Sequence, residues 1–177
     1  MQPRLIVSFL TLLVCLLGGV TMVRADNVDV EKAGIRKVIE ASIGWALNKD
    51  FDLLYRSLAQ DSNFFIYHPD NASTIIGFAA FKDYAETIFK GDQFRATRFE
   101  VKNLRVNLSA SGEVAWYSCL LDDFGEWNGK PGGWENCRWT GVLERREDKW
   151  VIVQMHFSFA TDQERESKNG SGSGPNK

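Results

Sequence analysis

Three long extended segments lie in residues 113–160, which read EVAWYSCLLDDFGEWNGKPGGWENCRWTGVLERREDKWVIVQMHFSFA. They are Glu113–Phe124, Trp134–Arg145 and Lys149–Ala160, and a fourth, Thr97–Asn107, precedes them. Clusters of turn-forming residues separate these segments at 109–112, 128–133 and 147–148. Short links between long strands predict consecutive antiparallel hairpins.

Toward the N-terminus, apolar residues recur at helical spacing in Val28–Asn48, Phe51–Ala59 and Phe78–Phe89. Two short runs, Asn63–Tyr67 and Ile75–Ile76, have the composition of strands. A long twisted sheet must cover one of its faces, and these helices are the available cover. The sequence therefore predicts the α+β class. The expected architecture is a cone-shaped barrel, in which a strongly curved, mostly antiparallel sheet wraps around three N-terminal helices and encloses a pocket.

The two ends of the chain differ in composition from its middle. Residues 1–25 have the pattern of a signal peptide, with Arg4 followed by an apolar run from Leu5 to Leu17. Residues 162–177 are rich in Glu, Lys, Ser and Gly, which predicts a disordered polar tail. We expect residues 26–161 to form one secreted or periplasmic domain, with no membrane attachment after signal cleavage. An uncleaved membrane anchor is the alternative.

Charge and composition exclude several classes of function. The formal net charge is −2. The charged residues that signal cleavage would remove are all basic, so the mature chain is still more acidic and is not suited to bind nucleic acid electrostatically. The sequence has two histidines and lacks the paired-cysteine pattern of a zinc site, so we predict no metal. It also lacks a glycine-rich phosphate loop, and we expect no cofactor. Six Trp and twelve Phe suit a fold that packs helices on a sheet around a cavity.

Export changes the interpretation of the cysteines. Signal cleavage would remove Cys15 and leave Cys119 and Cys137 in an oxidising compartment, where a disulfide persists. Both lie in segments that we expect to be neighbouring strands. We therefore predict a Cys119–Cys137 disulfide, with a pair of buried free thiols as the alternative.

The order of elements, together with several local motifs, resembles the nuclear-transport-factor-2-like superfamily and, within it, the SnoaL-like domains. The motifs that carry this resemblance are Trp45 with Asp50, Leu58-Ala59-Gln60-Asp61, Ile76-Gly77, Trp127-Asn128-Gly129-Lys130-Pro131, and Lys149-Trp150-Val151-Ile152-Val153-Gln154-Met155-His156-Phe157-Ser158. The resemblance implies the cone fold over about residues 30–160. It leaves the function open, because the superfamily includes isomerases, cyclases, dehydratases, epoxide hydrolases, transport factors and non-catalytic pocket modules.

His68 is the candidate catalytic residue. It ends an aromatic strand and precedes Pro69, at the position where the resemblance places an Asp general base, and an imidazole also moves protons near neutral pH. A half-exposed turn histidine is the alternative. Ser42 and Thr140 fall where the ketosteroid isomerases have a Tyr and an Asp that stabilise an enolate oxygen. Their short hydroxyls do not reproduce that site, so we do not expect steroid isomerisation.

Strand alternation sorts the remaining polar residues into two faces. With a turn at Glu147-Asp148, Thr140 pairs with Met155 and Arg138 with Phe157, and Trp116 joins their face if Cys119 pairs with Cys137. The resemblance places this face inside the cone, so the predicted pocket lining consists of Ser42, Trp116, Arg138, Thr140, Met155 and Phe157. The opposite face would hold Tyr117, Trp139 and His156, as a dimer surface or, if one β-bulge reverses the alternation, as pocket residues.

Three hypotheses about function follow, and the sequence leaves open whether the protein is an enzyme. The leading one is a non-catalytic module that binds an unknown small amphipathic molecule, anionic if Arg138 lies in the pocket, and forms a homodimer. The second is a small lyase, isomerase or hydrolase in which His68 is the general base and Arg138 orients an acidic substrate. The third is a structural assembly domain that uses Tyr117, Trp139 and His156 at a subunit contact.

Overall fold

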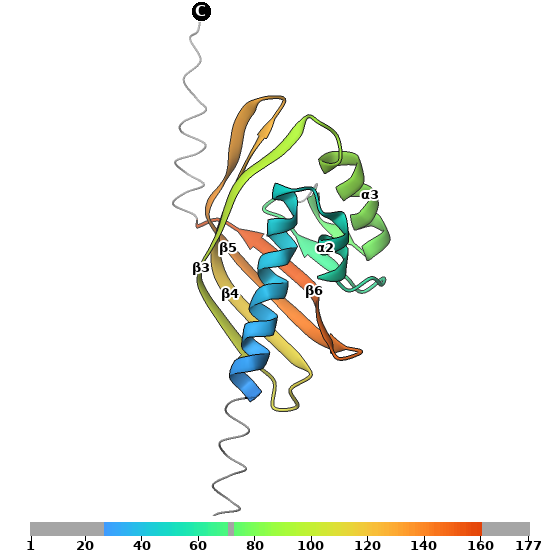
Figure 1. Cartoon of the computed structure of the whole chain (residues 1–177), viewed down its shortest axis with the longest axis vertical. Coiled ribbons are helices and arrows are strands. Elements are labelled where there is room, and N and C mark those ends of the chain that lie inside the picture. Colours follow the sequence, from blue (N-terminus) through green and yellow to red (C-terminus); the bar gives the residue numbers. More distant parts are fainter. Residues whose placement is uncertain (1–26, 71–72, 161–177) are drawn as a thin grey trace, which may run out of the picture. The chain divides into compact units, whose positions relative to one another are not determined.

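The computed structural model describes residues 27–70 and 73–160 (Figure 1). The chain divides into two compact units, Met1–Gly34 and Ile35–Lys177. The described residues of the first unit, 27–34, are helical. The expected signal peptide and the expected polar tail at 162–177 lie outside the described residues. None of the helices described here combines the length and the apolarity needed to span a bilayer.

The second unit begins with helix and then adds two further helices. Residues 35–44 are helical and continue into a 3₁₀ turn, η1 (Trp45–Leu47), before α2 (Phe51–Arg56) and α3 (Phe78–Phe89). Asp50 caps α2, since its carboxylate accepts a hydrogen bond of 2.9 Å from the Leu53 backbone N–H. The bounds predicted for α3 are confirmed, whereas α2 ends three residues earlier than its apolar spacing indicated.

The strands form one six-stranded sheet. They are β1 (Phe65–Tyr67), β2 (Ile75–Ile76), β3 (Phe94–Leu108), β4 (Val114–Trp127), β5 (Lys130–Arg146) and β6 (Lys149–Ser158). Their order across the sheet is β2-β1-β6-β5-β4-β3, and only the β1–β6 pair is parallel. The sheet is curved and open, with β2 and β3 at its edges (Figure 1). The predicted α+β fold, with N-terminal helices and a curved, mostly antiparallel sheet, is confirmed.

Tight turns make the β4–β5 hairpin longer than predicted. Asn128 and Gly129 have φ of +51° and +74°, the left-handed pair that a two-residue hairpin turn requires. The predicted six-residue loop at 128–133 is therefore wrong, because β5 already begins at Lys130. Pro131 is compatible with a strand here, since β6 pairs with β5 only from Arg138 onward and this end of β5 is an edge.

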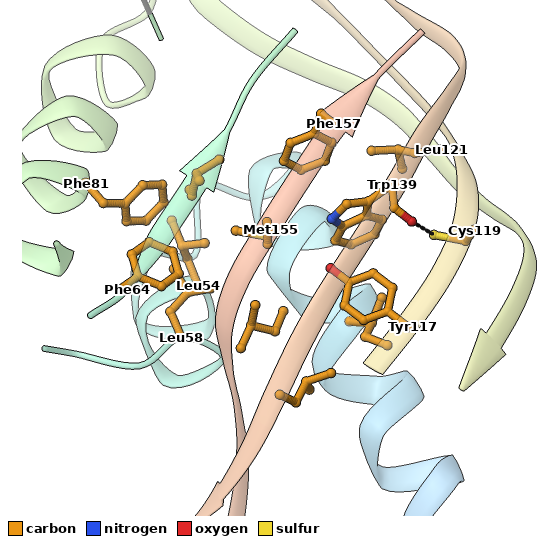
Figure 2. Packing of buried hydrophobic residues seen from close by; sticks show 14 of the residues in the cluster. Leu54, Leu58, Phe64, Phe81, Tyr117, Cys119, Leu121, Trp139, Met155 and Phe157 are labelled. Carbon is orange, nitrogen blue, oxygen red and sulfur yellow. Dashed lines mark hydrogen bonds between the residues drawn. The ribbon is translucent and has the colours of Figure 1, made fainter. Parts of the chain in front are cut away.

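The core lies between the helices and the inner face of the sheet. Figure 2 shows Leu54 from α2 and Phe81 from α3 on one side, with Trp139 and Phe157 from the central strands on the other. The Trp139 side chain is fully buried, and its ring stacks on Phe157 with centroids 5.6 Å apart. This aromatic packing fixes which face of β5 and β6 points inward.

A β-bulge shifts the pairing of β5 with β6 away from the predicted register. Val142 pairs with Gln154 and Leu143 with Ile152, so Val153 is left without a partner. As a result Thr140 pairs with His156 rather than with Met155, and the predicted register is wrong by one residue. Because side chains alternate between faces, this single residue reverses the face assignment along β5 and, through it, along β4.

The predicted Cys119–Cys137 disulfide is not formed, and both cysteines are free and buried. In the β4–β5 register, Cys119 lies opposite Trp139 and Cys137 lies opposite Leu121. The two thiols contact different backbone oxygens, Cys119 that of Trp139 (Figure 2) and Cys137 that of Ser158. Burial raises the pKa of each thiol to about 12, so both are protonated at neutral pH.

Candidate functional site

A cavity of about 370 Å³ opens between α3, the segment that follows β1, and the distal halves of β3, β4 and β5. Its surface is mainly apolar, six of its sixteen lining residues are Phe, Tyr or Trp, and several titratable side chains lie among them. The lining residues are His68, Asp70, Ser73, Tyr84, Ile88, Phe89, Phe94, Asp123, Phe124, Gly125, Glu126, Trp127, Lys130, Gly132, Gly133 and Trp134. An apolar hollow with a few polar groups converging on it is the usual form of a small-molecule site.

A smaller inner cavity of about 130 Å³ adjoins the first. The two share His68, Phe89, Phe94, Asp123 and Trp134 as lining residues. The inner cavity also reaches three residues that the sequence singled out as pocket lining: Ser42, Met155 and Phe157. The Ser42 hydroxyl is buried and donates to the Ile39 backbone oxygen at 2.8 Å, so this hydroxyl hydrogen is already engaged.

His68 lies directly after β1 and lines both cavities. Its Nδ1 is 2.6 Å from the Ser73 backbone oxygen. A carbonyl oxygen can only accept a hydrogen bond, so Nδ1 carries the proton and Nε2 of the neutral ring is left as a proton acceptor. The ring stacks on Phe157, with centroids 5.6 Å apart and an interplanar angle of 11°. His68 is thus held in a defined tautomer and orientation.

The backbone oxygen that holds His68 is itself fixed. Asp70 accepts hydrogen bonds from the Ser73 backbone N–H at 2.9 Å and from the Ser73 hydroxyl at 2.8 Å. Both bonds join residues three positions apart and tie Asp70 to Ser73. The imidazole therefore bonds to a carbonyl whose position the turn determines, which favours a constant tautomer.

Asp123 is the titratable group on the β4 wall of both cavities. Partial burial raises its pKa from the usual value to about 6, because the charged carboxylate loses part of its hydration and no hydrogen bond from the described residues offsets that loss. Sequence reasoning did not single out this residue. The signal was present, since Ala115, Tyr117, Cys119 and Leu121 alternate inward along β4 and Asp123 continues that series.

A second bulge, in β5, brings Trp134 to the cavity. Leu121 pairs with Cys137 but Asp123 pairs with Trp134, so β5 contains one extra residue here. Asn136 in this bulge has a φ of +54°, in the left-handed region. Without the extra residue, alternation from Cys137 would place Glu135 on the inner face and Trp134 on the outer face.

Asp122 connects this bulge to β3. Its carboxylate accepts from the Lys102 ammonium at 2.6 Å and from the Asn136 backbone N–H at 2.8 Å. The same ammonium donates to the Asn136 side-chain oxygen at 2.7 Å. The hydrogen bond from Asn136 and the one from Lys102 hold the pKa of Asp122 below its usual value. This network of three residues stabilises the β5 bulge at Asn136, next to the cavity.

The family model of the SnoaL-like domain matches residues 35–162, well over half of the chain. The chain belongs to the SnoaL-like domain family. This match covers the helices and the entire sheet of the second compact unit, and it confirms the resemblance on which the sequence analysis relied.

Solved structures agree with this assignment at the level of fold. A candidate scytalone dehydratase from Novosphingobium aromaticivorans superposes with a TM-score of 0.65 at 16% identity, covering 75% of this chain and 86% of that one. A candidate dehydratase of the nuclear-transport-factor-2-like family from Streptomyces avermitilis gives 0.60 at 16% identity, with 75% and 98% covered. A nuclear-transport-factor-2-like protein of unknown function from Pseudomonas putida gives 0.57 at 19%, with 77% and 92% covered. No curated protein matches the chain.

The outer face of the SnoaL-like sheet holds several residues that were predicted to line the pocket. Trp116, Arg138 and Thr140 are exposed on this face, which corrects their assignment to the interior. The cause is the bulge at Val153. His156 is exposed on the same face, outside the cavities described above.

Tyr117 and Trp139 lie on the inner face of the sheet, whereas the outer face was predicted for them. Both are buried in the core of the SnoaL-like domain, with ring centroids 5.1 Å apart. The Tyr117 hydroxyl and the Trp139 indole nitrogen have no hydrogen-bond partner among the described residues. These two side chains therefore cannot form a subunit contact in this fold.

Proposed function

We propose that this SnoaL-like domain is an exported pocket protein that binds a small, mainly apolar molecule and transfers a proton on it, as a lyase or isomerase. The observation that carries the proposal is the placement of His68, whose Nδ1 is bonded to a carbonyl and whose ring lines a mainly apolar cavity that also contains half-buried Asp123. The composition of residues 1–25 supports export.

The tautomer of His68 supports its role as a general base. Nε2 can take a proton from a carbon or an oxygen of the bound molecule, while the Nδ1–H to Ser73 bond continues to stabilise the imidazolium that forms. In an elimination of water, the proton leaves the carbon next to the one that carries the hydroxyl. The hydroxyl departs as water once the imidazolium returns the proton to it, so the histidine ends the cycle neutral.

Asp123 is the second polar group that a bound molecule can meet in the inner part of the pocket. Its carboxylate orients the substrate through a hydrogen bond in this proposal. Arg138, which the sequence analysis considered for that role, lies on the outer face and cannot reach the cavity. Two of the structural neighbours carry names of candidate dehydratases, which agrees with a lyase but describes those proteins.

The histidine pair allows a matched test. We expect His68→Gln to lower the turnover of small β-hydroxy carbonyl compounds by about 10²- to 10⁴-fold, the usual contribution of a general base. We expect His156→Gln, on the outer face, to retain the wild-type rate. The measurement is the absorbance of the unsaturated product in a substrate panel. Equal rates for the two variants would contradict the assignment of His68.

Binding without chemistry is the second candidate function, and the mainly apolar wall of the cavity favours it. The two candidates differ in one outcome. A compound that perturbs the imidazole NMR signals of His68 but not those of His156, and that is recovered unchanged after long incubation with the protein, supports a binding module.

Dimerisation through the outer sheet face is part of the proposal. Phe65, Gln154, Val142 and Trp116 lie side by side across four strands of this face, and Tyr67 pairs with His156 in the next row. Tyr67 is 49% exposed and Trp116 47% exposed, and no charged side chain separates them in these two rows. An apolar patch of this kind on a soluble domain indicates a protein contact.

We expect the wild-type protein to be a dimer and the double variant Tyr67→Glu/Trp116→Glu to be a monomer, because four buried charges would face one another across the contact. Light scattering after size-exclusion chromatography measures the mass. Trp127→Glu is the control, since Trp127 is 43% exposed on the hairpin but lies outside the patch. A wild-type monomer at high concentration refutes this part of the proposal.

A further inference from the structure

The charges around the cavity do not suit an anion. Among its lining residues Asp70, Asp123 and Glu126 are acidic, and Lys130 is the lysine. Glu126 is neutralised by Arg95, whose guanidinium donates to both carboxylate oxygens at 2.8 Å. Asp70 accepts the two hydrogen bonds from Ser73 described above.

Asp123 differs from the other two acids of the wall. Desolvation is the one cause acting on its pKa, so neither a cation nor a hydrogen-bond donor of the described residues offsets its burial. Lys130 is exposed at the tip of the hairpin, opposite Trp127 in the register, whereas Asp123 also lines the inner cavity. The pocket therefore contains one half-buried carboxylate for which no described residue supplies a charge or hydrogen-bond partner.

Aromatic residues line the same cavity as this carboxylate. Trp134 lies opposite Asp123 in the β4–β5 register, and Tyr84, Phe89 and Phe94 complete the wall of the outer cavity nearby. Ring faces carry negative electrostatic potential and attract cations, most strongly when water is excluded. A cavity that combines a carboxylate with aromatic walls is thus suited to a positively charged group on an otherwise apolar molecule.

We propose that the ligand of this pocket is a small aromatic or aliphatic molecule with one protonated amine, whose ammonium group donates to Asp123 between the ring faces. This inference rests on the pocket of the proposed function and specifies its ligand class. It reverses the anionic ligand that the sequence suggested from Arg138. The ammonium group would supply the charge partner that Asp123 lacks and would offset the cost of burying its carboxylate.

Three probes with the same ring system test the inference. They are 1-naphthylmethylamine, 1-naphthalenemethanol and 1-naphthoate, titrated separately into the full-length domain in a calorimeter at neutral pH. We expect the amine to bind at least about tenfold more tightly than the alcohol, with naphthoate weakest, because a charge-assisted hydrogen bond is about twice as strong as a neutral one. The wild-type ranking alone decides the sign of the preference and needs no variant.

Asp123→Asn then assigns the preference to one side chain. We expect this isosteric variant to lose about tenfold or more in affinity for the amine and to change by less than about threefold for the alcohol. Glu135→Gln removes the same charge from an exposed position of β5 outside the cavity lining and should leave all three affinities unchanged. Circular dichroism establishes that each variant is folded.

The outcomes separate the inference from the proposed function. If the alcohol or naphthoate binds best, or if Asp123→Asn does not weaken the amine, the inference is overturned while the pocket remains a binding site. If none of the three probes binds, the inference is also overturned, and the His68 and His156 variants still decide the proposed function independently.

Discussion

Replacing Asp122 with alanine is expected to lower the free energy of unfolding by about 3 kcal/mol, the low end of the cost of breaking a buried ion pair. The Asp122 side chain is 6% exposed and bonds to Lys102 at 2.6 Å and to the Asn136 backbone N–H at 2.8 Å. Removing the carboxylate leaves an ammonium and a backbone donor without this partner. The estimate stays at the low end because Lys102 is 25% exposed and recovers some hydration.

Urea denaturation measures this loss, and a second ion pair of the same sheet is the control. Arg95 and Glu126 also join β3 to β4, but Arg95 is 70% exposed, so Glu126→Ala should cost less than about 1 kcal/mol. A loss for Asp122→Ala no larger than that for Glu126→Ala would show that the network does not stabilise the fold.

The pH dependence gives an independent check on Asp122. Its pKa in the folded protein is lowered, mainly by the Asn136 N–H and by Lys102, so its stabilising effect is fully present above the unfolded-state pKa of about 4. That effect is lost as the pH falls through the lowered folded-state pKa. The difference in stability between wild type and Asp122→Ala should therefore shrink in acid and remain constant near neutrality.

The arrangement of the elements could be predicted because their signals are local. The spacing of Phe78, Phe81 and Ala85 is sufficient for α3, and the turn residues at Asn128-Gly129 and Glu147-Asp148 are sufficient for the order of the hairpins. This reasoning allowed for a β-bulge but could not locate the ones at Val153 and Asn136. A bulge inserts one residue without a strong composition signal, yet it exchanges the two faces for every residue beyond it.

The candidate site was therefore predicted in part. His68 could be found because it lies directly before a turn in the sequence. Its placement therefore did not depend on how the strands pair. Arg138 and Thr140 were assigned to the wrong face because their assignment passed through the bulge at Val153. Asp123 required only the alternation within β4, which no bulge interrupts on that strand between Ala115 and Asp123.

The bulges at Val153 and Asn136 also explain why one group of contacting aromatic rings belongs to both the pocket and the core. Trp139 faces inward because of the register that the Val153 bulge sets, and Trp134 faces inward because of the Asn136 bulge. Phe157 lies between them, with ring centroids 5.6 Å from Trp139 and 5.4 Å from Trp134. His68 lies against the same ring. A change at Phe157 should therefore affect folding and the site together.

We expect Phe157→Ala to lower the free energy of unfolding by about 4 kcal/mol, within the usual 3–5 kcal/mol for a buried Phe→Ala change. The side chain is 4% exposed and contacts three aromatic rings, so its removal leaves a cavity that these rings cannot close without breaking their own packing. The imidazole of His68 loses the ring on which it stacks. Its hydrogen bond to Ser73 and its more distant ring contacts with Tyr84 and Trp134 then remain to set its orientation.

Phe159→Ala is the matched control, because Phe159 is only partly buried and its described ring contact is with Trp134 alone, at 6.0 Å. Urea denaturation should show a loss of about 1 kcal/mol for this variant, in proportion to its smaller burial. Nitrogen NMR of the imidazoles should show His68 as a single Nδ1–H tautomer in wild type and Phe159→Ala, and as a mixture in Phe157→Ala. If Phe157→Ala destabilises the fold but leaves the tautomer unchanged, the carbonyl of Ser73 alone orients the candidate base and the stack serves the core.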